Sequence, residues 1–288
     1  MTLKVVVDTD IGDDIDDAFA LALACLSPEL EVVAVTTVYG DVKARAELAT
    51  RLLNSLGRDD IPVALGASKP ILGVGPSSQP TYYRALKDEG RRVKSIEDNA
   101  LDVLEKLVKA GEVDVLITLG PMTNAALFLL KRPDLAEGLK LVSMGGAYFM
   151  NTAEYNVKCD PEAASILVDS NCEKVLVGLD VTLKCLMKQE MIEALRAADR
   201  EHTRVLWSYT QAWMEASRHL PILHDPLAVA VAFERNLVEV QPAHVKVELT
   251  GRYTRGYTVI EKGDPNAVIC KDVNVEKFLN LFTKRVLG

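Results

Sequence analysis

The chain has 288 residues, of which 49% are hydrophobic and 26% are charged, and its formal net charge is −8. This composition is typical of a globular protein and excludes a disordered chain, and the negative charge argues against a nucleic acid partner, because phosphate contacts need clustered Lys and Arg. No apolar run approaches the ~20 residues of a membrane-spanning helix, so we expect no membrane partner.

The first two thirds of the chain are predicted to alternate strands with helices. The apolar run Val5–Val7 is typical of a buried strand, and the pattern from Ala18 onward indicates a buried helix. Further strands are predicted at Glu31–Val38, Ile61–Leu65, Val113–Leu119, Leu139–Met144 and Lys174–Leu179, and further helices at Val42–Leu56, at Asn99–Ala110, and from Thr123 and Pro161. Strands that alternate with helices at this spacing indicate βαβ units and a mainly parallel sheet.

Two regions depart from this alternation. Residues 66–97, rich in Gly, Pro and Ser and then in charge, are predicted to form a long loop or lid. The last third has predicted helices at Lys188–Ala198, Glu201–Arg218, Pro226–Glu234 and Val275–Val286, and a predicted β pair of Val245–Leu249 with Tyr257–Ile260. Because no repeat or linker divides the chain, we expect one α/β domain over residues 1–288, an open and mainly parallel sheet flanked by helices, with a C-terminal helical region and a small β pair.

The cysteines and the N-terminus bear on the compartment. None of the five cysteines forms a C-x-x-C pair, which indicates free thiols in a reducing compartment. The N-terminus runs directly into the first predicted strand, without the apolar leader of a signal peptide. We therefore expect a cytoplasmic protein.

An acidic loop follows the first predicted strand. Six aspartates fall within ten positions, namely Asp8, Asp10, Asp13, Asp14, Asp16 and Asp17. Carboxylates this close resist ionising together, and a hard divalent cation such as Ca²⁺ or Mg²⁺ relieves their repulsion. Helix capping explains one or two of Asp14, Asp16 and Asp17, but it does not explain six aspartates. The loop therefore predicts a metal site.

Polar residues also follow several other predicted strands, where ligands bind in open α/β sheets. These segments are Thr36–Asp41, Leu119–Asn124, Gly145–Asn156 and Asp180, and they offer mainly oxygen atoms. The chain has only four histidines, which argues against a His-rich zinc site, and no G-x-G-x-x-G, P-loop or G-x-S-x-G motif. Taken alone, His224-Asp225-Pro226 indicates an Asp N-cap with Pro at the first helical position.

The segment VVVDTDIGDDIDDAFAL (5–21) resembles the N-terminal signature D-x-D-x-G-x-D-D-A of the inosine/uridine-preferring nucleoside hydrolase family. The resemblance continues in order through TTVYGD (36–41), LGPMTNAA (119–126), VSMGGAY (142–148), AEYNVKCDPEAA (153–164) and HDPLAVA (224–230). It covers nearly the whole chain. It implies an open α/β protein, a homodimer or homotetramer, that binds Ca²⁺ at the strand ends and hydrolyses the N-glycosidic bond of ribonucleosides to free base and ribose.

The resemblance also implies roles for individual residues. Asp10 would be a calcium ligand and the general base that acts on a metal-bound water. Further ligands would be Asp17, Asp225 and the backbone carbonyl of Leu119, and His224 would protonate the leaving base. The residues implied to bind the sugar are Asp16, Met144, Asn151, Glu154 and Asn156. Carboxylates and amide oxygens suit this chemistry, because N-ribosyl cleavage passes through an oxocarbenium-like sugar.

The chain departs from the family pattern in three places. Asp13, Asp14 and Ile15 separate Gly12 from the Asp-Asp pair, where the family usually has one residue, so Asp14 remains an alternative ligand. Asp41 stands at a sugar-contact position where many members carry Asn. Residues 66–97 contain no histidine, so base recognition differs there and the base preference is open. The aromatic residues that either stack on the base or belong to the core or lid are Tyr82, Tyr83, Trp207 and Trp213.

Two other functions fit parts of the sequence. A haloacid-dehalogenase-like phosphatase also places D-x-D after a buried strand, with a nucleophilic first Asp, here Asp8, but it leaves Asn151, Glu154, Asn156 and His224 without a role. A nucleoside- or sugar-binding protein would keep the scaffold and metal without turnover, which is consistent with the departure at Asp41.

Overall fold

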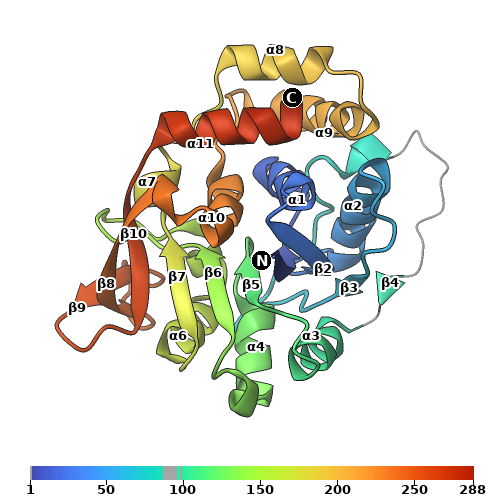
Figure 1. The fold of residues 1–288 in the computed structure, drawn as a ribbon. Helices are drawn as coiled ribbons and strands as arrows, with labels where there is room; N and C mark the ends of the chain where they lie inside the picture. Colours follow the sequence, from blue (N-terminus) through green and yellow to red (C-terminus); the bar gives the residue numbers. More distant parts are fainter. Residues whose placement is uncertain (1, 87–95, 98) are drawn as a thin grey trace.

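In the computed structural model, which describes residues 2–86, 96, 97 and 99–288, a ten-stranded sheet has the strand order β4-β3-β2-β1-β5-β6-β7-β10-β8-β9 (Figure 1). The strand β1 (Leu3–Thr9) lies inside the sheet and pairs in parallel with β2 (Leu30–Thr37) and β5 (Val115–Thr118). Both faces of a central parallel strand are covered, which explains its continuous apolar run.

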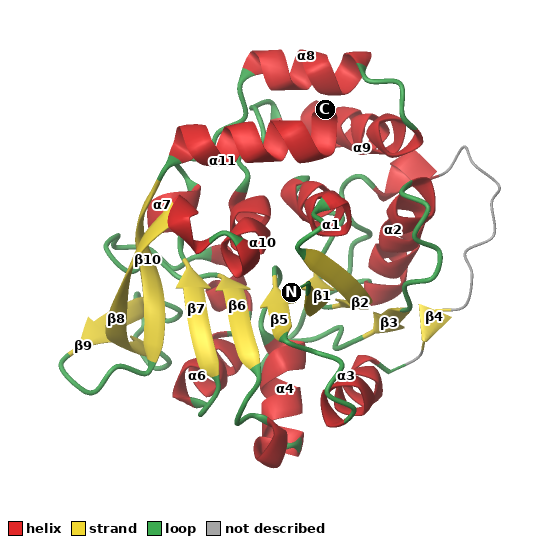
Figure 2. Ribbon diagram, in the orientation of Figure 1, coloured by secondary structure: helices red, strands yellow, loops and turns green. Residues whose placement is uncertain are grey.

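The parallel part of the sheet also includes β3 (Val63–Leu65), β4 (Ile96–Glu97), β6 (Lys140–Met144) and β7 (Glu173–Val177). Figure 2 shows helices on both sides of it, and these are α1 (Asp16–Leu26), α2 (Val42–Ser55) and α10 (His224–Phe233) on one face and α3 (Ala100–Lys109), α4 (Thr123–Lys131) and α6 (Pro161–Asp169) on the other. The predicted fold class, an α/β fold with a mainly parallel sheet flanked by helices, is confirmed.

Each face of the sheet has its own hydrophobic core. Val5 and Val7 pack into the core that contains Phe19 of α1, whereas Val6 packs into the core that contains Phe128 of α4. This division follows from the pleat, because successive side chains of a strand point to opposite faces.

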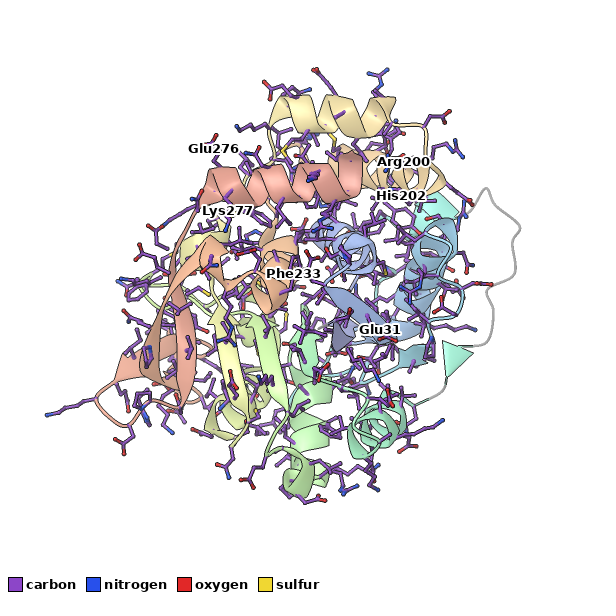
Figure 3. All side chains as sticks on the ribbon, in the orientation of Figure 1. Glu31, Arg200, His202, Phe233, Glu276 and Lys277 are labelled. Atoms are coloured by element: carbon purple, nitrogen blue, oxygen red, sulfur yellow. The ribbon has the colours of Figure 1, made fainter. Side chains whose placement is uncertain are left out.

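A further layer of helices lies outside α1, α2 and α10. It consists of α8 (Gln189–Ala197), α9 (Glu201–Ser217), α11 (Val275–Phe282) and the π-helical end Thr283–Leu287. Lys277 of α11 pairs with Glu234 after α10 at 3.2 Å, and Figure 3 labels Lys277 on α11 and the buried His202 on α9, close to the end of the chain. No helix in the described residues is long and apolar enough to cross a membrane.

The C-terminal strands correct one prediction. The predicted β pair exists, since β8 (Val238–Val247) pairs antiparallel with β9 (Thr258–Glu261). However, β8 begins at Val238 rather than Val245, and β10 (Ala267–Val273), which was not predicted, joins β8 to β7. Its apolar run is only four residues long and is followed by the exposed pair Lys271-Asp272. The sequence therefore has no strand pattern that extends over the whole of β10.

Smaller corrections concern segment ends near the strand termini. The predicted strand Lys174–Leu179 ends at Val177, because Gly178 begins the short helix α7 (Leu179–Thr182). The predicted loop at 66–97 contains a 3₁₀ helix, Tyr83–Leu86, as well as β4, and its residues 87–95 lie outside the described residues. The remaining short helices are α5 (Tyr155–Cys159) and the 3₁₀ turns Pro133–Leu135 and Arg235–Leu237. All five cysteines are free, as predicted.

Candidate active site

A cavity of about 190 Å³ lies at the carboxyl ends of the central strands. This is the edge of the sheet where the sequence predicts a ligand site. The arrowheads of β6 and β7 point toward α7 and α10 at this edge (Figure 1). The cavity is lined by Asp10, Asp13, Asp14, Asp16, Asp17, Leu119, Met144, Glu154, Tyr155, Asn156, Leu179, His224 and Asp225. Residues separated by more than 200 positions therefore meet here, because parallel strands deliver their carboxyl ends to one edge.

Three buried aspartates form the centre of the site. Asp16, Asp17 and Asp225 each offer a carboxylate oxygen, and these oxygens lie within 4.8 Å of one another. Asp16 and Asp17 belong to the first turn of α1, and Asp225 to the first turn of α10, which packs against α1. Thr9 Oγ1 donates to Asp17 Oδ1 at 2.5 Å, and the Asp225 N–H donates to Asp16 Oδ2 at 3.1 Å.

Burial and mutual repulsion work against ionisation of this cluster. Both effects raise the pKa values of Asp16, Asp17 and Asp225 well above the ordinary range. Burial also raises the pKa of Asp10 to about 6, against an opposing effect of Arg45. Three buried carboxylates whose oxygens converge, with no nitrogen or sulfur donor among them, fit a hard divalent cation.

Asp10 reaches the cavity from the end of β1, next to the cluster of three aspartates. Its side chain is nearly buried and lines the cavity with them. Gly120 permits this approach, because a Cβ at position 120 would lie 2.6 Å from Asp10 Oδ1. Asp8, by contrast, does not line the cavity, since it accepts hydrogen bonds inside the sheet from Thr36 Oγ1 (2.5 Å) and Asn124 Nδ2 (2.7 Å). A nucleophilic role of Asp8, which the phosphatase alternative requires, has no support from this position.

Glu154 and Asn156 also line the cavity. The Glu154 carboxylate caps α5, accepting N–H groups from Asn156 (2.8 Å), Val157 (3.0 Å) and Gly146 (3.1 Å), and burial raises its pKa to about 7. Asn156 Nδ2 donates to the Leu119 carbonyl at 2.5 Å and to the carbonyl of Met144 at 3.2 Å. Four predicted site residues, Leu119, Met144, Glu154 and Asn156, are thus brought together.

His224 is the first residue of α10 and lines the same cavity. Its Nδ1 shares a hydrogen bond of 2.7 Å with Thr182 Oγ1 of α7. Burial lowers the pKa of His224 to about 4, so its imidazole is neutral at pH 7. The capping interpretation of Asp225 is wrong, because α10 begins at His224 and the helix is preceded by Leu223. Pro226 fits inside the first turn, where its missing N–H has no intrahelical partner to lose.

Two predicted sugar-binding residues are not brought into the cavity. Asp41 caps α2, accepting the Ala44 N–H at 3.0 Å, and Asn151 is exposed, with its backbone carbonyl accepting from the Tyr257 hydroxyl. Asp14, the alternative ligand, does line the cavity. The four aromatic residues considered for base stacking, Tyr82, Tyr83, Trp207 and Trp213, do not line it.

Sequence reasoning missed Arg45, Tyr155, Leu179 and Thr182. Tyr155 and Leu179 line the cavity, and Thr182 bonds His224. Arg45 is buried beside the acidic loop. A signal for Arg45 exists in the sequence, because it occupies the helical stripe of Leu48, Ala49 and Leu52, where a core residue is expected.

Comparisons with known proteins agree with this geometry. A family model described as inosine-uridine preferring nucleoside hydrolase matches residues 5–280. The chain is 33% identical, over an alignment of 312 positions, to the pyrimidine-specific ribonucleoside hydrolase RihA of Salmonella agona, and the alignment covers 99% of each chain.

Solved structures of nucleoside hydrolases share the fold. The plant nucleoside hydrolase PpNRh1 superimposes with a TM-score of 0.88 at 28% identity over 100% of both chains. The purine-preferring ribonucleoside hydrolase from Gardnerella vaginalis has a TM-score of 0.88 at 29% identity, covering 99% of this chain and 98% of that chain. These matches span the sheet, its helices and the acidic loop, and the chain belongs to the inosine-uridine preferring nucleoside hydrolase family.

Proposed function

We propose that this protein hydrolyses the N-glycosidic bond of ribonucleosides in a Ca²⁺-dependent reaction, releasing the free base and ribose. The observation that carries the proposal is the convergence of Asp16, Asp17 and Asp225 in one cavity with Asp10 and His224. Membership of the nucleoside hydrolase family supports the reaction class.

The cation would be held by Asp10, Asp17 and Asp225 together with the backbone carbonyl of Leu119, all of which line the cavity. When bound, Ca²⁺ orients a water molecule and lowers its pKa. The Leu119 carbonyl already accepts from Asn156 Nδ2, and a carbonyl oxygen has a second lone pair for another partner.

The carboxylates would act on the water and on the sugar. Asp10 takes the proton of the attacking water as the general base. Asp16 and Glu154 bind the sugar, together with Asn156, and the oxygen atoms of these side chains favour the positive charge that develops on the ribose in the transition state. Met144 lines the sugar pocket. Asp41 and Asn151 do not line the cavity, so their proposed sugar contacts have no support from it.

His224 would act on the leaving base. When Thr182 donates its hydroxyl proton to Nδ1, the imidazole proton resides on Nε2. This Nε2–H is a hydrogen-bond donor toward the base as negative charge builds on it. Transfer of a proton to the base needs the imidazolium form, which gives up one proton and returns to the neutral imidazole, so the developing charge on the base has to raise the pKa of His224 above its lowered value.

The test is the release of reducing sugar from a panel of purine and pyrimidine ribonucleosides, with added Ca²⁺ and after chelation. Both base classes are included because the relatives are named for both. Ribose release that chelation abolishes is the expected result. No release from any nucleoside while calcium remains bound would contradict the proposal and favour a nucleoside- or sugar-binding protein. Light scattering tests the accompanying prediction of a homodimer or homotetramer, and fractionation tests the cytoplasmic location.

A further inference from the structure

Arg45, a buried arginine of α2, has no part in the proposed chemistry. The residue is 1% exposed, because it lies on the face of α2 that carries the core residues Leu48 and Leu52. Burying a guanidinium costs free energy unless the charge is paired and the donors are satisfied. The hydrogen bonds of Arg45 show which part of the structure this buried charge holds in place.

The guanidinium donates to three backbone carbonyls and one carboxylate. Nε donates to the Tyr39 carbonyl at 2.6 Å, and Nη1 donates to the carbonyls of Asp10 and, at 3.2 Å, Ile11. Nη2 pairs with Asp13 Oδ2 at 2.7 Å. These acceptors follow β1 and β2, so one rigid, planar group ties the two strand-end loops together.

The loop that Arg45 holds is the one that carries Asp10. The backbone carbonyl of Asp10 accepts a hydrogen bond from Arg45, whereas the carboxylate of Asp10 lines the cavity. Farther along the loop, Asp13 Oδ1 accepts from the N–H of Thr81 at 3.1 Å and from its hydroxyl at 3.2 Å. The extra residues between Gly12 and the Asp-Asp pair thus supply an anchor for the arginine and for the segment at Thr81.

Arg45 also contributes charge without blocking the aspartates. None of the described residues that line the cavity is a lysine or an arginine. The hydrogen bonds of Arg45 go to backbone carbonyls and to Asp13, so they leave the carboxylate oxygens of Asp16, Asp17 and Asp225 to face one another.

We propose that Arg45 is a positioning residue, which holds the carbonyls of Asp10 and Ile11 so that the acidic loop keeps the conformation that binds a divalent cation. The inference rests on the proposed function for the place of the cation site, but it concerns cation binding rather than turnover.

Lys174 of β7 provides a matched control. It is also buried, and its ammonium donates to the carbonyls of Ser170 (2.8 Å), Asn266 (2.9 Å) and Val168 (3.4 Å). However, Lys174 lies near the amino end of its strand, away from the cavity at the carboxyl ends. Loss of either cation should destabilise the fold, but only Arg45 should affect the cation site.

The experiment measures the dissociation constant for Ca²⁺ by titration calorimetry on the full chain after chelation and dialysis, with circular dichroism to verify folding. The proteins are the wild type, Arg45→Lys, Arg45→Met and Lys174→Met. We expect Arg45→Lys, which keeps the charge but loses the fork, to weaken calcium binding by about 10-fold, and Arg45→Met by more, up to about 100-fold. We expect Lys174→Met to change it by less than about twofold.

Equal calcium affinity of the wild type and Arg45→Lys would overturn the positioning role, as would an equal loss in Lys174→Met. If neither Arg45 variant folds, Asp13→Asn decides, because it removes the anchor of Nη2 at a partly exposed position. Unchanged calcium affinity of Asp13→Asn would then overturn the inference. Calcium binding by a wild type that hydrolyses no nucleoside would contradict the proposed function alone. Equal calcium affinities of the wild type and Arg45→Lys would overturn the inference about Arg45 alone, and a wild type that binds no calcium would overturn both.

Discussion

Acidic residues cluster in two regions of this molecule, with opposite consequences. On the surface of α3 and α4, Glu105 accepts hydrogen bonds from Lys109 (2.5 Å), Lys131 (3.0 Å) and Arg132 (2.6 Å). These cations lower the pKa of Glu105 to about 2. At the carboxyl ends of the strands, burial instead raises the pKa of Asp10 to about 6.

The difference between the two clusters is the supply of positive charge. The surface cluster is neutralised by side chains and by water, and such exposed pairs contribute little to stability. The buried cluster has several carboxylates beside the single guanidinium of Arg45, which makes it costly to fold and receptive to a cation. Residues arranged against stability in this way are typical of functional sites, where binding offsets the cost.

The sharpest test of this contrast removes one charge from each cluster. Asp10→Asn should lower kcat by about 10³-fold, because it deletes the general base, while circular dichroism shows an intact fold. Asp102→Asn, which removes the partner of Lys131 in the surface cluster, should leave kcat unchanged. A hydrolysis rate of Asp10→Asn close to that of the wild type would contradict the role of Asp10 as the general base.

Loss of His224 should slow hydrolysis most for substrates whose leaving group needs protonation. His224→Ala should slow inosine hydrolysis by about 10²-fold, and it should slow p-nitrophenyl riboside far less, because that leaving group needs no protonation. Steady-state kinetics on both substrates measures the difference. Equal losses on the two would remove His224 as the acid.

Calcium should stabilise the buried cluster in a way that has no counterpart at the surface. At a concentration 100 times its dissociation constant, a ligand that binds only the folded state adds about 2.7 kcal/mol to the free energy of unfolding. Scanning calorimetry should therefore show a higher Tm with Ca²⁺ than after chelation, and Asp225→Asn should reduce the increase. The same Tm with and without Ca²⁺ would contradict a calcium site.

Without calcium, stability should fall as the pH rises from about 6.5 to about 8. Burial raises the pKa of Asp8 and of Glu154 to about 7, so in this window the folded protein retains protons that the unfolded chain has released. His224 has a lowered pKa and the opposite sign, but its contribution is smaller than that of the two carboxyl groups in this window and is complete by about pH 7.5. A Tm of the chelated protein that stays constant or rises over this range would refute the prediction.

The surface cluster should show the smallest effects. Glu105→Gln removes a partner of three cations, but the cluster is partly exposed and screened by salt, so we expect a slight decrease in Tm that becomes smaller in concentrated salt. Calcium affinity and kcat should not change. A decrease in Tm as large as the gain from calcium would break the comparison between the two clusters.

Features that are local in the chain were predictable. The apolar run of β1, the acidic loop and the alternation of strands and helices appear in the sequence because neighbouring residues make them. The carboxyl-end rule for parallel sheets then placed Asp10, Leu119 and Glu154 at one edge without knowledge of any distance. The strand β10 was not predicted and the start of β8 was predicted too late, because partly exposed strands near the edge of the sheet lack a long apolar pattern.

Only the packing of distant segments decided which polar residues share the cavity. Asp225 meets Asp16 because α10 packs on α1, whereas Asp41 is used as a helix cap and Asn151 is exposed. The position of Arg45 on the core stripe of α2 marks it as unusual, but only the fold shows that it donates to the carbonyls of the acidic loop. Sequence patterns describe what a residue prefers, but hydrogen-bond partners separated by tens or hundreds of positions exist only after the chain has folded, and those partners determine what each polar group does.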